Sequence, residues 1–438
     1  MSPAATARRA ATLLRRHTGL LSIAGGSAAG QLAAFLLLPV VSRLYDPSDF
    51  GALAVVTAYA VTLATFATLR LELAVPLARS DDDAFRLVFL ALACSLLVAV
   101  LTGVGLAFFG EDAGRALGHA DYSSVLWMMA PLMFAYAAYL ALAQAAVRQE
   151  RLTAVGTRNT LQPLVTTGAQ VGLGIIWPTP AALIAGAALG YGTGAASLLR
   201  PRHARRARRE LQPADLWETV SRHRRYPLTL LPAGVMNTLG LQLPVVFVAW
   251  RYGTDSAGSF GMALRVLGLP VTLIGAAMAQ VYLARVAKQV RSGQANAWVS
   301  FVRATRALLL AGAGFLVAVL ALAPWAFSTV LGAQWADAGR YAQVLAIAVA
   351  SQLVAVPLSQ TLIATGRLGL QLAWDATRLV VVTGALLLPA TVGWNATATI
   401  LTYSLASALM YAVMWLLCAR AARSSDARAE PAAEPVTS

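Results

Sequence analysis

Four arginines lie within or at the edges of long apolar stretches of this sequence, at Arg43, Arg70, Arg265 and Arg378. Charged groups in such stretches are costly and usually functional. A guanidinium is always charged and presents a rigid fork of N–H donors, which suits it to phosphate. The arginines are therefore candidate ligands for an anion. Snorkelling at a helix end remains open for Arg70 and Arg265, and an interfacial anchor for Arg43.

Two acids accompany these arginines. Glu72 follows Arg70 in "TLRLELAVP", and Asp375 precedes Arg378 by three residues in "WDATRLV". A carboxylate at the edge of an apolar segment can bind and release H⁺ or Na⁺, so both acids are candidates for ion coupling. The spacing of Asp375 and Arg378 also allows a purely structural ion pair within one helix.

Nothing in the sequence indicates a catalytic, metal or cofactor site. It contains no P-loop, no Gly-rich dinucleotide turn and no nucleophile elbow. The histidines all fall in tails or loops, and none has a cysteine or carboxylate at ligand spacing: His17, His119, His203 and His223. We therefore expect a protein that is not an enzyme, with no catalytic residue, no metal and no cofactor.

The composition indicates a membrane protein with many spans. Hydrophobic residues make up 58% of the 438 positions and charged residues only 12%, against about 45–50% and about 25% in soluble domains. Apolar runs of roughly 18–25 residues, enough to cross a bilayer, predict twelve helices. They are 19–41, 50–69, 87–109, 125–147, 160–177, 181–199, 228–250, 260–284, 304–330, 341–365, 372–394 and 397–418.

The distribution of basic residues predicts the orientation. If the N-terminus is cytoplasmic, only five of the 34 Lys and Arg lie on the outer side, in agreement with the positive-inside rule. These five are Arg43, Arg115, Arg251, Arg265 and Arg340. We therefore expect a multi-pass protein of the plasma membrane with both termini in the cytoplasm.

The longest inner connection carries "RPRHARRARR" at 200–209. Although the net charge of the chain is +15, no RNA-binding module or interleaved aromatics accompany these arginines, so we expect no nucleic acid. Anionic membrane lipids are the predicted partner. The connection divides the chain into a six-helix bundle at 1–199, a basic linker at 200–226 and a second six-helix bundle at 227–420, followed by a disordered tail at 421–438.

Because both halves begin on the inner side, we expect an all-α fold of two six-helix bundles related by a pseudo-twofold axis along the membrane normal. A weak trace of the repeat links "LPVVSRLYDPSDFGALA" (38–54) to "LPVVFVAWRYGTDSAGSFGMAL" (243–264). Gly186, Gly190 and Gly194 recur every four residues, and this spacing predicts close helix packing.

Several of these segments resemble a known family. "RLYDPSDFG" after the first span, "TLRLELAVPL" closing the second, "FGMALRVLGLPVTLIGAAMAQVYLARVAK" (260–288) and "VLGAQWADAGRYAQVLA" (330–346) are similar to polysaccharide transporters. These are the O-antigen and exopolysaccharide flippases of the multidrug/oligosaccharidyl-lipid/polysaccharide exporter superfamily.

The resemblance implies that the protein turns a polyprenyl-pyrophosphate-linked oligosaccharide from the inner to the outer leaflet by alternating access, for surface or exopolysaccharide synthesis. It implies a diphosphate ligand for Arg43, Arg70, Arg265 and Arg378, and H⁺ or Na⁺ coupling through the acids. A polysaccharide polymerase or glycosyltransferases are further expected partners.

Two other functions stay open at this stage. A cation-coupled small-molecule or drug antiporter of the same superfamily would favour carboxylates deep in the first-half helices. Glu72, at an edge, is the only acid there. A membrane glycosyltransferase or ligase would need larger outer loops bearing acidic catalysts, whereas the longest outer loop here has only about 15 residues.

Overall fold

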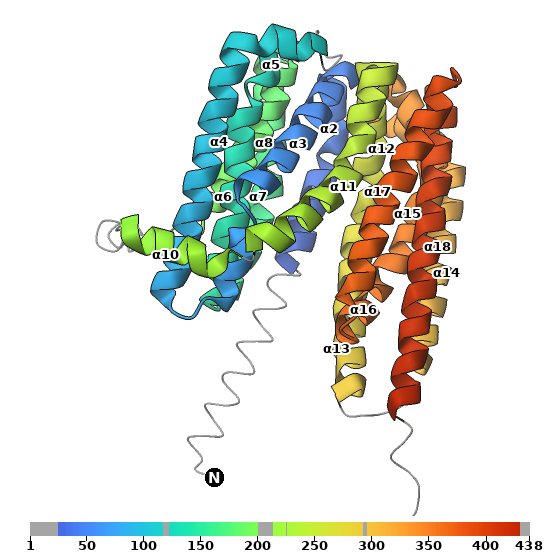
Figure 1. Cartoon of the computed structure of the whole chain (residues 1–438). Helices are drawn as coiled ribbons and strands as arrows, with labels where there is room; N and C mark the ends of the chain where they lie inside the picture. Colours follow the sequence, from blue (N-terminus) through green and yellow to red (C-terminus); the bar gives the residue numbers. More distant parts are fainter. Residues whose placement is uncertain (1–24, 117–121, 200–212, 225, 292–295, 430–438) are drawn as a thin grey trace, which may run out of the picture. The chain divides into compact units, whose positions relative to one another are not determined.

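The computed structural model describes residues 25–116, 122–199, 213–224, 226–291 and 296–429 (Figure 1). These residues are helical apart from short turns, and no strand occurs among them. They group into two compact units divided between Gly258 and Ser259. The predicted all-α membrane fold is confirmed.

The first unit begins with a bent helix pair, Gly25–Leu36 and α2 (Leu38–Leu44), whose axes meet at 41°. The bend precedes Pro39, since proline cannot continue the helical hydrogen bonds. The following elements are α3 (Pro47–Ala67), η1 (Leu71–Leu77), α4 (Asp81–Ala116), α5 (Ser123–Leu126), α6 (Met129–Arg148), α7 (Leu152–Ile176), α8 (Pro180–Ala196), α10 (Pro213–His223), η3 (Tyr226–Leu230) and α11 (Leu231–Tyr252).

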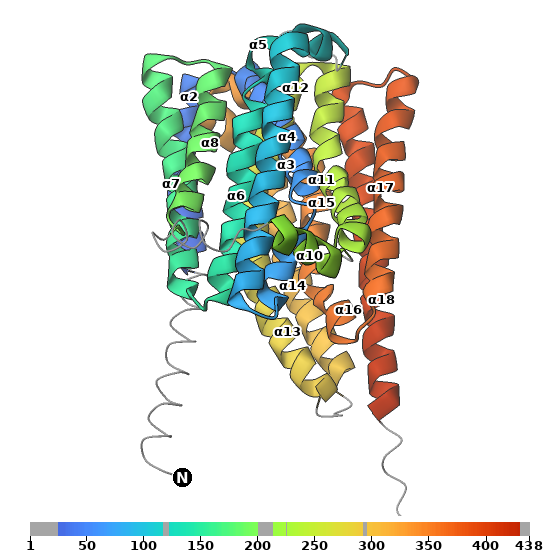
Figure 2. The ribbon, with the colours of Figure 1, turned by 60° about the vertical axis from the view of Figure 1, so that its left-hand side comes forward.

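The second unit begins within α12 (Thr254–Pro270), because the division between the units falls inside this helix. Its other elements are η4 (Val271–Gly275), α13 (Ala276–Arg291), α14 (Ala297–Ala326), η5 (Phe327–Leu331), η6 (Ala333–Trp335), α15 (Ala336–Leu358), α16 (Gln360–Ala364), α17 (Leu368–Thr391) and α18 (Ala396–Ala429). Its long helices α14, α15, α17 and α18 run side by side (Figure 2).

All twelve predicted spans correspond to helices among the described residues. Nine helical stretches are long and apolar enough to cross a membrane, and the bent pair makes a tenth. The remaining two are α7 and α8. Large apolar side chains such as Leu101 (62% exposed) and Leu310 (77% exposed) face outward. An exposed apolar surface of this kind suits contact with lipid.

The division between the units falls later than the predicted linker at 200–226, of which residues 200–212 lie outside the described part of the chain. The reason is that α11 packs along α3 and belongs to the first unit. Thr238 of α11 and Thr65 of α3 share a hydrogen bond of 3.4 Å between their hydroxyl oxygens.

The segment "YDPSDFG" has a structural role at the start of α3. Asp46 and Asp49 form a capping box in which each side chain accepts a hydrogen bond from the other's backbone N–H, and Pro47 occupies the first turn. Such a cap satisfies N–H groups that the helix itself leaves unpaired. Tyr45 donates a 2.7 Å hydrogen bond to the carbonyl of Gln170 and so ties this turn to α7.

The glycine series of α8 lies against α7, as predicted. A Cβ on Gly186 would come within 2.6 Å of Gln170, and one on Gly190 within 2.8 Å of the Gln162 carbonyl. A Cβ on Gly194 would lie 3.0 Å from the Tyr139 ring. The missing side chains therefore let α7 and α8 approach closely and leave room for Tyr139.

The predicted disordered tail is corrected over residues 421–429, because α18 continues to Ala429. The sequence lacks large apolar residues here, but the buried Ala421 and Ala422 pack in a hydrophobic cluster and polar contacts hold the helix. The carboxylate of Asp426 accepts hydrogen bonds from the backbone N–H groups of Ala297 (2.9 Å) and Trp298 (3.0 Å) and so caps α14. Arg367 donates a 2.6 Å hydrogen bond to Ser424. Residues 430–438 lie outside the described part.

We predict that Gly190→Ala destabilises the first unit by about 1–3 kcal/mol, the usual cost of overpacking, because its methyl group would overlap α7. The thermal unfolding midpoint of the purified protein in detergent measures this loss. Gly192→Ala is the matched control, since it lies on the same helix and its Cβ would meet nothing within 4 Å. Equal midpoints for the two variants would contradict close packing at Gly190.

Candidate anion-binding sites

Arg70 and Glu72 come together where α3 ends. Leu69 and Arg70 adopt left-handed backbone conformations with φ of 52° and 56°, which cost energy in residues other than glycine and often mark functional sites. This turn leads into η1 and aims Glu72 inward, leaving its residue only 2% exposed. The Arg70 guanidinium lies 3.6 Å from a Glu72 carboxylate oxygen. The two side chains thus form an ion pair in which Glu72 is buried and the Arg70 side chain is 19% exposed.

Burial raises the pKa of Glu72 above its ordinary value. Hydrogen bonds to its own backbone and to Thr68, and the positive charge and hydrogen bond of Arg70, act in the opposite direction without cancelling the effect. Glu72 consequently keeps its proton to a higher pH than an exposed glutamate would. This property suits a group that exchanges a proton during a cycle.

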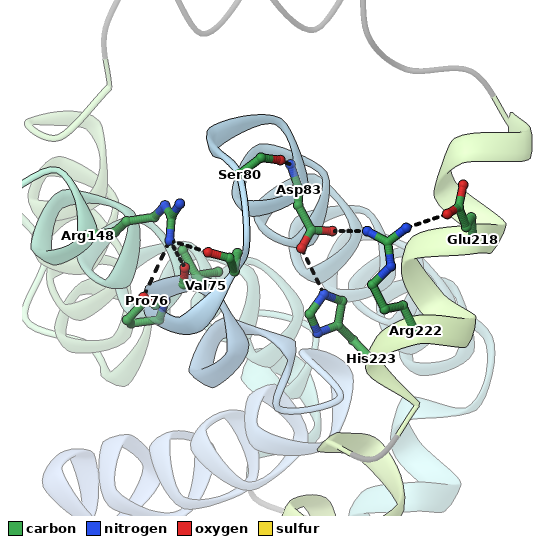
Figure 3. A network of polar contacts seen from close by, with 9 residues as sticks. Val75, Pro76, Ser80, Asp83, Arg148, Glu218, Arg222 and His223 are labelled. Carbon is green, nitrogen blue, oxygen red and sulfur yellow. Dashed lines mark hydrogen bonds and ion pairs between the residues drawn. The ribbon is translucent and has the colours of Figure 1, made fainter.

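Arg148, at the end of α6, holds η1 in place (Figure 3). Its guanidinium donates hydrogen bonds to the carbonyls of Val75 (3.4 Å), Pro76 (3.4 Å) and Ala78 (2.8 Å), and it pairs with Asp81 at 3.3 Å. These carbonyls lie at the end of η1, where a helical segment leaves acceptors unsatisfied. Arg148 thereby fixes the segment that carries Glu72.

Arg158 is a functional candidate that sequence analysis missed. It lies in α7, is 7% exposed, and stacks its guanidinium carbon 3.4 Å from the centre of the Tyr139 ring. Tyr139 and Tyr136 each contact Tyr191 of α8 edge to face, with ring centres 5.2 Å and 5.0 Å apart. Arg70, Glu72 and Arg158 all interact electrostatically with Tyr136. One region of the first unit thus gathers two arginines, one acid and three tyrosines.

A second polar network fastens α10 to the start of α4 in the first unit (Figure 3). Asp83, 3% exposed, lies 3.0 Å from the ring nitrogen Nε2 of His223 and 3.8 Å from Arg222. Arg222 also pairs with Glu218 one turn earlier on α10. The short helix therefore lies across the end of the bundle opposite α5 (Figure 1), near the η1 segment.

In the second unit, Arg378 is buried in an aromatic environment. It is 8% exposed, its guanidinium carbon lies 5.1 Å from the centre of the Trp374 ring, and it donates a 3.4 Å hydrogen bond to the Tyr411 hydroxyl. Asp375 accepts a 3.4 Å hydrogen bond from Gln371. Within the described structure Arg378 bonds to Tyr411 rather than forming the ion pair with Asp375 that their spacing allows.

The two other predicted arginines occupy different surroundings. Arg43 is exposed at the end of α2. It is separated from Arg70 by the length of the 21-residue helix α3, about 30 Å at 1.5 Å per residue, so the structure does not bring them together. Arg265 is half-buried in α12 and interacts with neighbouring groups. No cluster of three or more metal-binding side chains occurs among the described residues.

Comparison with known proteins places the chain among transporters of polysaccharide synthesis. Residues 40–340 match the family described as polysaccharide biosynthesis protein. The chain is similar to the succinoglycan biosynthesis transport protein ExoT of Rhizobium meliloti, with 24% identity over 365 residues that cover 80% of this chain and 69% of the relative.

The fold is that of the multidrug transporters of the MOP superfamily. An inward-facing multidrug resistance MATE family transporter superposes with a TM-score of 0.60 at 12% identity, covering 96% of this chain and 99% of that one. A MOP superfamily transporter from Pyrococcus furiosus gives 0.58 at 11% identity, covering 94% and 96%. At these identities the likeness concerns the fold alone. The resemblance inferred from the sequence motifs is confirmed.

We predict that Gly234→Ala lowers the activity of the Arg70 site without unfolding the protein. A Cβ on Gly234 of α11 would lie 2.6 Å from the guanidinium carbon of Arg70, so the flexible arginine must move. Loss of a charged hydrogen bond of about 1.5 kcal/mol corresponds to roughly tenfold weaker ligand binding. Substrate transport into vesicles measures the effect. Gly168→Ala, whose Cβ would meet nothing within 4 Å, is the control, and equal transport by both variants would contradict the role of Arg70.

Proposed function

Because the chain belongs to the polysaccharide biosynthesis protein family, we propose that it moves a polyprenyl-diphosphate-linked oligosaccharide between the two leaflets of the plasma membrane. The observation that carries the proposal is the buried positive charge in each unit. Arg158 and Arg378 are both at least nine-tenths buried. A buried charge is strongly destabilising without a compensating partner, and a diphosphate supplies the opposite charge.

The chemistry of the carrier lipid supports this assignment. Its diphosphate must leave water to pass the hydrocarbon, which has a high cost in free energy. Arginine forks donate several N–H groups to phosphate oxygens at fixed geometry. Tyrosines beside Arg158 and Arg378 add hydroxyl groups and aromatic faces. A site of this composition favours an anion with several oxygens over a cationic drug.

The substrate class also agrees with the transporter relative. ExoT is named for succinoglycan transport, and we extend a related role in surface or exopolysaccharide synthesis to this chain. In that role both termini would be cytoplasmic, anionic lipids would contact the basic connection at 200–209, and a polymerase or glycosyltransferases would act before or after transport.

A small-molecule antiporter is the second candidate, favoured by the MATE-like fold. Its coupling group in the first unit would be Glu72, which is paired with Arg70. Since the other buried acid of that unit, Asp83, is occupied by His223 and Arg222, the unit offers few carboxylates for a cationic solute.

We predict that the chain restores surface polysaccharide in a strain lacking its own lipid-linked-oligosaccharide flippase. Arg378→Gln should reduce the restored polysaccharide by about tenfold or more, the equivalent of one charged hydrogen bond. Arg306→Gln, an exposed arginine of the same unit, is the control. Membrane abundance is measured by immunoblotting. Failure of the abundant wild-type chain to restore polysaccharide would contradict the proposal.

We further predict that Glu72→Gln uncouples transport from a proton gradient. The amide imitates the protonated carboxyl that burial already favours, so the variant cannot release a proton. Transport by the wild type should change with a midpoint above the ordinary glutamate pKa of about 4.3, and the variant should lack this change. Uptake by proteoliposomes across a range of pH provides the measurement. Glu111→Gln, whose side chain is 86% exposed, should behave as wild type, and retention of the pH response in Glu72→Gln would refute the assignment.

A further inference from the structure

Arg158 and Arg378 occupy equivalent positions in the two halves of the sequence, each of which holds six predicted spans. Each lies on the helix preceding the last helix of its half, α7 or α17, and each stacks on an aromatic ring. The Nε atom of each is buried and has no hydrogen-bond partner among the described residues. Neither guanidinium forms an ion pair with a carboxylate in the described structure.

The residues around the two arginines recur in both halves with the same types and the same spacing. A tyrosine that interacts with the arginine follows 33 residues later on the next helix, Tyr191 after Arg158 and Tyr411 after Arg378. A threonine precedes each arginine directly. The hydroxyl of Thr157 donates to the carbonyl four residues earlier at 3.1 Å, and that of Thr377 does so at 2.8 Å.

This agreement extends to the helix pairs. The helices α7 and α8 pack against each other, and so do α17 and α18. In each pair the first helix supplies the threonine and arginine and the second supplies the tyrosine. Three residues matched in type and spacing indicate an internal repeat, although the stacked ring comes from α6 for Arg158 and from the arginine's own helix for Arg378.

We infer that Arg158 and Arg378 are equivalent anion subsites of an internal repeat, and that each binds the phosphate oxygens of a diphosphate lipid within its own unit. The inference rests on the proposed function and adds that the two arginines are copies of one site. The ring fixes one face of each guanidinium by a cation–π contact. The Nε–H of each has no acceptor among the described residues, and a phosphate can accept several guanidinium donors.

Binding of farnesyl diphosphate to the purified full-length protein in detergent tests this inference, with farnesol as the uncharged control. Ligand-dependent shifts of the thermal unfolding midpoint give the apparent affinity. Arg158→Gln and Arg378→Gln should each reduce the ligand-dependent midpoint shift to about half that of the wild type, because one site remains, and the double variant should show no shift. Arg306→Gln should bind as wild type.

The lysine variants separate ligand binding from a structural role. Arg158→Lys and Arg378→Lys keep the charge but lose the planar fork, so each should bind less tightly than wild type with an unchanged midpoint in the absence of ligand. If a glutamine variant does not fold, the lysine variant of the same arginine replaces it in the binding measurement.

The outcomes distinguish the two proposals. If the wild type binds farnesyl diphosphate but either arginine can be replaced without reducing the midpoint shift, the equivalence of the subsites is wrong while the proposed function stands. Absence of wild-type binding also overturns the subsites. The proposed function is judged separately, by restoration of surface polysaccharide.

Discussion

The cost of holding guanidinium charge inside an apolar helix bundle is the constraint on which this structure depends. Arg70 has Glu72 as a partner, but Arg158 and Arg378 are surrounded by aromatic rings and hydroxyl groups. Rings and hydroxyls lower the cost of the charge without neutralising it. The bundles must therefore be rigid enough to keep these groups buried, and they gain from any anion that enters.

Rigidity comes from close backbone packing and from polar clamps at helix ends. Gly186 and Gly190 of α8 let α7 approach closely, and Gly194 leaves room for the Tyr139 ring on which Arg158 stacks. Arg148 fixes η1 through its terminal carbonyls, and Asp83 fastens α10 to the same end of the unit. Each clamp lies at a chain reversal, where a helix alone would leave groups unpaired.

The sequence predicts the helices well because apolar length is a strong signal in a membrane protein. Arg70, Glu72 and Arg378 could also be identified as candidates from the sequence, since each interrupts an apolar run. Arg158 was missed because the span was drawn from residue 160, so the arginine was assigned to the preceding inner connection. The helical end at 421–429 was missed because its stability comes from Asp426 and Arg367, contacts between segments far apart in the sequence.

The continuation of α18 has a mechanical consequence. Its 34 residues span about 51 Å at 1.5 Å per residue, well beyond a hydrocarbon layer of about 30 Å. Near Ala429, the carboxylate of Asp426 binds the backbone at the beginning of α14, so the ends of the two helices are held together. About 20 Å of α18 must therefore lie outside the hydrocarbon layer, and the contacts of Asp426 brace its C-terminal end.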